Sequence, residues 1–144
     1  MESTLKELQV PEYGPLLVDF LRKCHHLERR LASASGIPLD ELYCLALLHR
    51  HSPPSVKALS RLLGVHITRT SKLLNALEAR GYILRTLDPG DRRRELITLS
   101  PAGLRMVQVV YTVSARTWER AFPAGKEEVL RAVGGLVEDM SVPV

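Results

Sequence analysis

The spacing of apolar residues predicts two helices in the first third of the chain. Between Leu17 and Ala34, apolar residues recur three or four positions apart, which predicts an amphipathic helix that ends near Gly36. The segment "IPLDELYCLALLHRHSPP" follows, with one proline near its start and two at its end. It predicts a second helix, and we expect this helix to be buried because residues 42–48 are apolar on most sides.

Residues 55–81 have the pattern of two short helices joined by a tight turn, which predicts a helix-turn-helix. In "SVKALSRLLGV", Ser55 is a good N-cap and Gly64 suits a helix C-terminus. In "HITRTSKLLNALEARG", a helical wheel places one set of residues toward the core: Ile67, Thr70, Leu73, Leu74 and Leu77. The opposite face holds Thr68, Lys72, Asn75 and Ala79, with Arg69 and Ser71 on its flanks.

After Gly81 the period changes to that of β-strands. "YILRTL" and "ELITLS" are short runs rich in apolar and β-branched residues, and "DPGDRRR" separates them, which predicts a hairpin with a long basic tip. Asp88-Pro89-Gly90 has the composition of a turn. Ser100-Pro101 then predicts the N-cap and first turn of another helix, and a last amphipathic helix follows a break at residues 123–125.

The predicted order is α-α-α-α-β-β-α-α, a mainly α fold with a small β-hairpin wing. We expect an N-terminal dimerisation helix in residues 1–36, a winged helix-turn-helix lobe in residues 37–100 and C-terminal dimerisation helices in residues 101–144, intertwined as one domain. The outer helices carry apolar residues that one small domain cannot bury, so we expect a second copy of the chain to cover them, giving a homodimer.

Charge is concentrated in the middle of the chain. Residues 42–77 carry five basic residues and no acidic residue, and residues 78–123 carry eight basic and five acidic residues, whereas both ends are net acidic. A basic centre between acidic ends indicates a polyanion as the partner of the centre. A solvated surface that happens to be basic is the alternative.

Composition excludes several classes of protein. No apolar run approaches the ~20 residues that cross a bilayer, and the N-terminus lacks the pattern of a secretion signal. Two cysteines are too few for a disulfide scaffold, which favours a cytoplasmic protein with reduced thiols. We expect neither an enzyme nor a cofactor-dependent protein, because the sequence has no Gly-rich phosphate loop, nucleophile elbow or pair of carboxylates in a suitable site.

The predicted outward face of the second helix of the helix-turn-helix suits a DNA major groove. Its side chains are polar and short, and no carboxylate precedes Glu78. Arginine and lysine pair with guanine edges, asparagine pairs with adenine, and serine and threonine serve bases or phosphates. A wing arginine gains from the negative potential of a narrow minor groove, and Asp91 is placed to hold the guanidinium of Arg93. An ordinary solvated helix face is the alternative.

The segment from about Ile37 to Leu104 resembles the MarR family of bacterial winged-helix regulators. The resemblance rests on "VKALSRLLGV", "TRTSKLLNALEARGYILR", "DPGDRRRELITLS" and "LSPAG". It implies an obligate homodimer bound to a pseudo-palindromic operator in double-stranded DNA, with one recognition helix in each half-site and half-sites roughly 34 Å apart. It also implies a repressor that releases DNA when a small anionic or phenolic ligand binds, or when a cysteine is oxidised.

The resemblance assigns DNA contacts by position. The major-groove candidates are Thr68, Arg69, Ser71, Lys72 and Asn75. Arg93, oriented by Asp91, is the minor-groove candidate, and Arg92 is the candidate for a phosphate contact. A winged helix used for protein contacts is a rival interpretation, which the positive face of the recognition helix opposes.

The sequence names no signal, but it offers candidates for sensing one. A pocket for an anionic ligand needs a cation and an apolar wall, and the candidates are Arg22, His25, His26, Tyr43, Arg50 and Trp118. Cys24 is the candidate for redox sensing, although its position departs from that of the peroxide-sensing relatives, and Cys44 lies in an apolar run. We predict no metal site, because "RMVQVVYTV" lacks the histidine pair of the zinc-sensing relatives.

Overall fold

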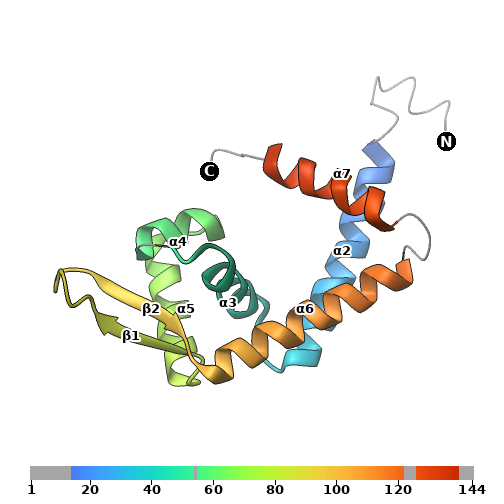
Figure 1. Cartoon of the computed structure of the whole chain (residues 1–144). Helices are drawn as coiled ribbons and strands as arrows, with labels where there is room; N and C mark the ends of the chain where they lie inside the picture. The colour runs from blue at the N-terminus through green and yellow to red at the C-terminus, as the bar shows by residue number, and fades with distance from the viewer. Residues whose placement is uncertain (1–13, 54, 122–125, 140–144) are drawn as a thin grey trace.

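The computed structural model describes residues 14–53, 55–121 and 126–139, and these form six helices and one hairpin (Figure 1). The element bounds, with the labels of Figure 1, are α2 Gly14–Ser35, α3 Leu39–His51, α4 Val56–Leu63, α5 Ile67–Ala79, β1 Ile83–Leu87, β2 Glu95–Leu99, α6 Pro101–Ala121 and α7 Lys126–Asp139. The predicted order and fold class are confirmed over the described residues.

The predicted helix ends are confirmed by their hydrogen bonds. The side chain of Ser55 accepts a hydrogen bond from the backbone N–H of Ala58 at 3.1 Å, which caps α4. Gly64 ends α4 with φ +66°, a left-handed conformation that costs glycine little. The turn between α4 and α5 is therefore fixed by local chemistry.

The core of the winged lobe lies around α3. This helix packs against α2, α4, α5, α6 and β2, and four of its apolar side chains are buried: Leu42, Cys44, Leu45 and Leu48. The other elements contribute Leu59 from α4, Leu74 and Leu77 from α5, Ile83 from β1 and Val107 from α6. The prediction that α3 is buried is confirmed, and the hydrophobic contacts around it hold α5 and the hairpin in place.

The hairpin is antiparallel, with Ile83 opposite Leu99 and Leu87 opposite Glu95. Burial decreases along β1, from a buried Ile83 to an exposed Leu87. The strands therefore start against the core and extend away from it, and the loop of residues 88–94 lies at the far end (Figure 1). We call β1, this loop and β2 the wing.

A tight joint connects the wing to α6. Ser100 donates from Oγ to the carbonyl oxygen of Gly81 at 2.5 Å and accepts from the N–H of Gly103 at 3.1 Å. A Cβ at position 103 would lie 2.0 Å from the carbonyl oxygen of Tyr82, so only glycine fits there. The predicted N-cap at Ser100 is confirmed, and "SPAG" acts as a packed joint.

Helices α2 and α6 extend away from the winged lobe and contact each other (Figure 1). The first part of α2 exposes five large apolar side chains: Leu16, Leu17, Val18, Phe20 and Leu21. Among the described helices, none alone has the length and apolar character needed to cross a membrane; α2 and α3 meet these two criteria only as a pair, bent by 87°.

Candidate nucleic-acid interface

Helix α5 divides into a buried face and an exposed face, as its sequence predicts. Thr70, Leu74 and Leu77 are buried, whereas Thr68 and Lys72 are exposed. The prediction is wrong for Ile67, which is 43% exposed, because it lies in the first turn of α5 at the edge of the core. The core contacts of three successive turns fix which side of α5 faces solvent.

The small polar side chains of α5 make local contacts. His66 caps the helix, since its Nδ1 accepts from the N–H of Thr68 at 3.3 Å and lies 3.1 Å from the Thr68 hydroxyl. The Ser71 hydroxyl donates to the carbonyl oxygen of Ile67 at 3.0 Å, and Ser71 is half-buried. Lys72 is exposed and forms no ion pair with any described residue, so its ammonium group is available to a phosphate or a base.

Arg69 lies on the flank of α5 and forms an ion pair with Asp40, in the first turn of α3. The side chains of both residues remain partly exposed. The contact directs Nη2 of Arg69 toward α3, so the carboxylate of Asp40 competes with DNA for this guanidinium.

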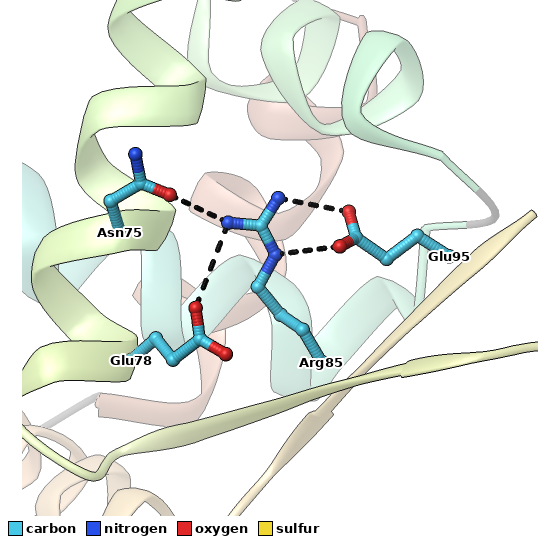
Figure 2. A network of polar contacts seen from close by, with 4 residues as sticks. All are labelled: Asn75, Glu78, Arg85 and Glu95. Carbon is cyan, nitrogen blue, oxygen red and sulfur yellow. Dashed lines mark hydrogen bonds and ion pairs between the residues drawn. The ribbon is translucent and has the colours of Figure 1, made fainter.

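Arg85 is a functional candidate that the sequence did not reveal. From β1 it donates through Nε and Nη2 to both carboxylate oxygens of Glu95, each at 2.9 Å, and through Nη1 to Oδ1 of Asn75 at 2.7 Å (Figure 2). Glu78 lies 3.9 Å from the same Nη1. The hydrogen bonds to Glu95 raise the pKa of Arg85 further above its ordinary value, and the charges of Glu95 and Glu78 act in the same direction.

The Arg85 contacts join α5 to both strands of the wing. Within the wing, the register of the two strands explains the contact between Arg85 and Glu95. Arg85 pairs with Ile97, so Glu95, two residues before Ile97, lies diagonally opposite Arg85 on the same face of the hairpin. Nothing in the sequence linked Arg85 to Asn75, which lies on another element.

The loop of the wing is ordered by its two aspartates. Asp88 accepts from the N–H of Gly90 at 2.8 Å, which confirms the predicted turn. Asp91 accepts from the backbone N–H of Arg93 at 3.0 Å, and no described ion pair joins the two side chains. The expected bond to the guanidinium of Arg93 is therefore wrong for this structure, because the short Asp91 side chain turns toward the nearer backbone amide. Arg92, Arg93 and Arg94 are all exposed.

A cavity of about 600 Å³ separates the winged lobe from the outer helices. Its wall is largely apolar, and its polar side chains are Asp40, Tyr43, Arg50, His51 and Tyr111. Tyr43 and Arg50 are the only two ligand candidates in its described lining. Asp40, which pairs with Arg69, lies in the same lining, so one carboxylate connects the cavity with α5.

The other ligand candidates lie elsewhere or outside the described side chains. Arg22 pairs with Asp19 at 3.6 Å on the surface of α2, and His25 lies 3.5 Å from Glu28 on the same helix. His26 lines a separate, shallow pocket on α2. The Trp118 side chain falls outside the described part. Arg22, His25 and His26 are not in the lining of the cavity, so the prediction that they share one pocket with Tyr43 and Arg50 is wrong for these three. His25 still lies near the cavity, because its partner Glu28 accepts a hydrogen bond from the Tyr43 hydroxyl at 2.6 Å.

The two cysteines differ in burial. Cys44 is fully buried in the core, and desolvation raises the pKa of its thiol to about 12. Cys24 is half-buried on α2, and its redox role stays a prediction. In the described ranges, no three His, Cys, Asp or Glu side chains come together as a group that would hold a metal ion.

Comparisons with known proteins agree with this geometry. The MarR family profile matches residues 35–94, which include the helix-turn-helix and most of the wing. The chain is 23% identical over 125 residues to the uncharacterized HTH-type transcriptional regulator YxaD of Bacillus subtilis (strain 168), covering 87% of each chain.

Two solved structures are similar in fold. CouR from Rhodococcus jostii RHA1, bound to p-coumaroyl-CoA, has a TM-score of 0.74 and 21% identity, covering 92% of this chain and 94% of CouR. The DNA complex of MepR from S. aureus has a TM-score of 0.59 and 20% identity, covering 90% of this chain and 98% of MepR. Together with the helix-turn-helix and basic wing, these findings support a DNA-binding transcriptional regulator that is similar to members of the MarR family.

Proposed function

We propose that a homodimer of this chain binds a pseudo-palindromic operator, with α5 of each protomer in the major groove of one half-site. The observation that carries the proposal is the shared exposure of Lys72 on α5 and three arginines at the tip of the wing. Lys72 lies on a helix that packs against the core, and the arginines lie on a loop that Asp88 and Asp91 order through backbone hydrogen bonds. Such an arrangement suits a backbone of regularly spaced phosphates. The similarity of fold to MepR, solved in complex with DNA, supports the same docking.

The individual contacts follow from the exposed side chains. Lys72 and Asn75 are proposed to reach the floor of the groove, while Thr68 and Ser71 contribute hydroxyl groups beside them. Arg93 enters the minor groove and Arg92 contacts a phosphate. Asp91 orders the backbone of the loop through its bond to the N–H of Arg93, and it does not orient the Arg93 side chain. Arg69 joins the interface when its ion pair with Asp40 opens.

The exposed apolar face of α2 supports the homodimer and the division into a lobe and outer helices. Five large side chains between residues 16 and 21 are more than half exposed in one protomer. A contiguous apolar surface of this kind is typical of a subunit interface. We therefore propose that residues 1–36 and 101–144 form the dimerisation region and residues 37–100 the DNA-binding lobe, acting in the cytoplasm.

We also propose that the regulator is a repressor, released by a small ligand in the cavity beside α3. The cavity combines an apolar wall with the guanidinium of Arg50, which suits a small anionic or phenolic molecule. The hydroxyl groups of Tyr43 and Tyr111 also line it, and they already contact Glu28 at 2.6 Å and His49 at 3.3 Å. The cavity also contains Asp40, the partner of Arg69, so a ligand there lies next to a contact of α5. The similarity to CouR, solved with p-coumaroyl-CoA, supports a ligand-responsive regulator.

A salt series tests the DNA-binding proposal. Fluorescence anisotropy is measured with duplex DNA from the promoter next to the gene itself, and several neutralised phosphates in each half-site predict a steep linear fall of log K with log salt concentration. Arg93→Ala and Lys72→Ala should each weaken binding while the dimer, measured by light scattering, stays intact. Arg131→Ala on α7 removes the same charge outside the winged lobe and is the matched control. A flat salt response, or equal losses in all three variants, contradicts the proposal.

A further inference from the structure

The orientation of the Asn75 amide is set by Arg85. An arginine side chain has five N–H donors and no acceptor, so only the amide oxygen of Asn75 can face it. The distance from Nη1 of Arg85 to Oδ1 of Asn75 is 2.7 Å. The Asn75 nitrogen lies on the side away from the guanidinium (Figure 2), and in the described structure it has no hydrogen-bond partner. The exposed end of this side chain therefore carries its N–H groups.

Arg85 is itself held on three sides. Both oxygens of Glu95 accept from it at 2.9 Å, Glu78 lies at 3.9 Å, and the Arg85 side chain is only 19% exposed. A bidentate pair of this kind fixes the plane of the guanidinium as well as its position. Turning the Asn75 oxygen toward DNA would leave Nη1 of Arg85 without its shortest contact.

This arrangement changes what Asn75 can recognise. Reading adenine requires the amide to accept from the N6 amino group and to donate to N7 at the same time, so oxygen and nitrogen must face the base edge together. With its oxygen turned toward the wing, Asn75 presents donors alone. Guanine is the base whose major-groove edge offers two neighbouring acceptors, O6 and N7.

We propose that Asn75, held by Arg85, reads a G·C pair in each half-site rather than the A·T pair that asparagine ordinarily reads. The inference rests on the proposed docking of α5 in the major groove. Asn75 is the specificity-determining residue, and Arg85 is a positioning residue that acts through it. The wing thereby sets the base preference of the recognition helix without touching that base.

Selection from a random duplex library, followed by sequencing, tests the inference with the full-length protein. The wild type should enrich one symmetric pair of positions for G·C over A·T by about ten-fold, the discrimination expected of a good pair of base contacts. Asn75→Ala should lose that preference at these two positions alone. Since Asn75 is exposed and alanine favours helices, this variant should fold normally.

Arg85→Lys separates the positioning role from a merely structural one. Lysine keeps the charge near Glu95 but has no planar fork to hold both carboxylate oxygens and the Asn75 amide. The freed amide can then present oxygen and nitrogen together, so the same two positions should accept A·T as well as G·C. Arg131→Lys makes the same exchange at an exposed arginine of α7, outside the winged lobe; it is the matched control and should leave the preference unchanged.

The outcomes distinguish this inference from the proposal on which it rests. If the wild type enriches no sequence, the proposed DNA binding fails and the inference fails with it. If the wild type enriches an operator but Asn75→Ala alters an A·T position, or no position, the docking stands and the inference is overturned. The melting temperature of each variant shows whether Arg85→Lys folds. If Arg85→Lys does not fold, the base preference of Asn75→Ala by itself tests the inference.

Discussion

Replacing Gly103 by alanine tests the joint between the wing and α6. The added Cβ would lie 2.0 Å from the carbonyl oxygen of Tyr82, about 1 Å inside the closest approach that real Cβ atoms show, and 3.2 Å from Cδ2 of Leu99. The obstacle is backbone, so a rotamer change cannot relieve it. The Tyr82 carbonyl also accepts from the N–H of Ser100 at 3.0 Å, so any relief strains that hydrogen bond as well.

The magnitude follows from two opposing effects. Overpacking of this kind costs about 1–3 kcal/mol, while alanine in place of glycine in a helix returns up to about 1 kcal/mol. We therefore expect the free energy of unfolding to fall by about 1–2 kcal/mol, which lowers the melting temperature by roughly 2–8 °C in a chain of this size. Because the wing moves relative to α6, DNA affinity should fall as well.

The assay is thermal unfolding followed by circular dichroism, at one protein concentration because dimerisation makes the melting temperature concentration-dependent. Gly134→Ala in α7 is the matched control, since a Cβ there meets no atom within 4 Å and only the helix propensity changes. The control should be unchanged or slightly stabilised. Equal melting temperatures for the two variants, or a more stable Gly103→Ala, would refute the reasoning about the joint.

Three further predictions concern other contacts of the winged lobe. Arg80→Ala should lower the free energy of unfolding by about 1–3 kcal/mol in urea titrations, because it leaves the buried carboxylate of Glu41 without its 2.8 Å partner; an unchanged midpoint would contradict this. Above pH 9 the Cys44 thiol loses its proton in the unfolded state, while the folded state keeps that proton up to about pH 12. The free energy of unfolding should therefore fall as pH rises from 9 to 12, by at most about 1.4 kcal/mol per pH unit. Cys44→Ala should reduce that slope in urea titrations at pH 9 to 11, and an equal slope would refute the burial argument. Asp40→Asn should strengthen DNA binding several-fold in anisotropy titrations, because it releases Arg69, and weaker binding would show that the ion pair aids docking.

The sequence alone determined the order and type of the described elements and the face that α5 turns to solvent. These features depend on local physics: apolar spacing, the N-caps at Ser55 and Ser100, and the turn at Gly64 act within a few residues. The exposure of Lys72 followed from the same spacing, and the exposure of the wing arginines followed from their place in the polar segment between the two strands.

Only the tertiary structure decided how the site residues are held. Asp40 and Arg69 are 29 positions apart, and Arg85 lies 10 positions from Asn75, so no periodicity relates these partners. Asp91 lies in the loop as predicted, but it accepts a hydrogen bond from the backbone N–H of Arg93 and not from its guanidinium. The Asp91 side chain is short, and the backbone N–H is the nearer donor. Local spacing fixes which side of an element faces solvent, whereas the partner of a long charged side chain depends on how separate elements pack. That packing also determines which end of the Asn75 amide remains free to meet DNA.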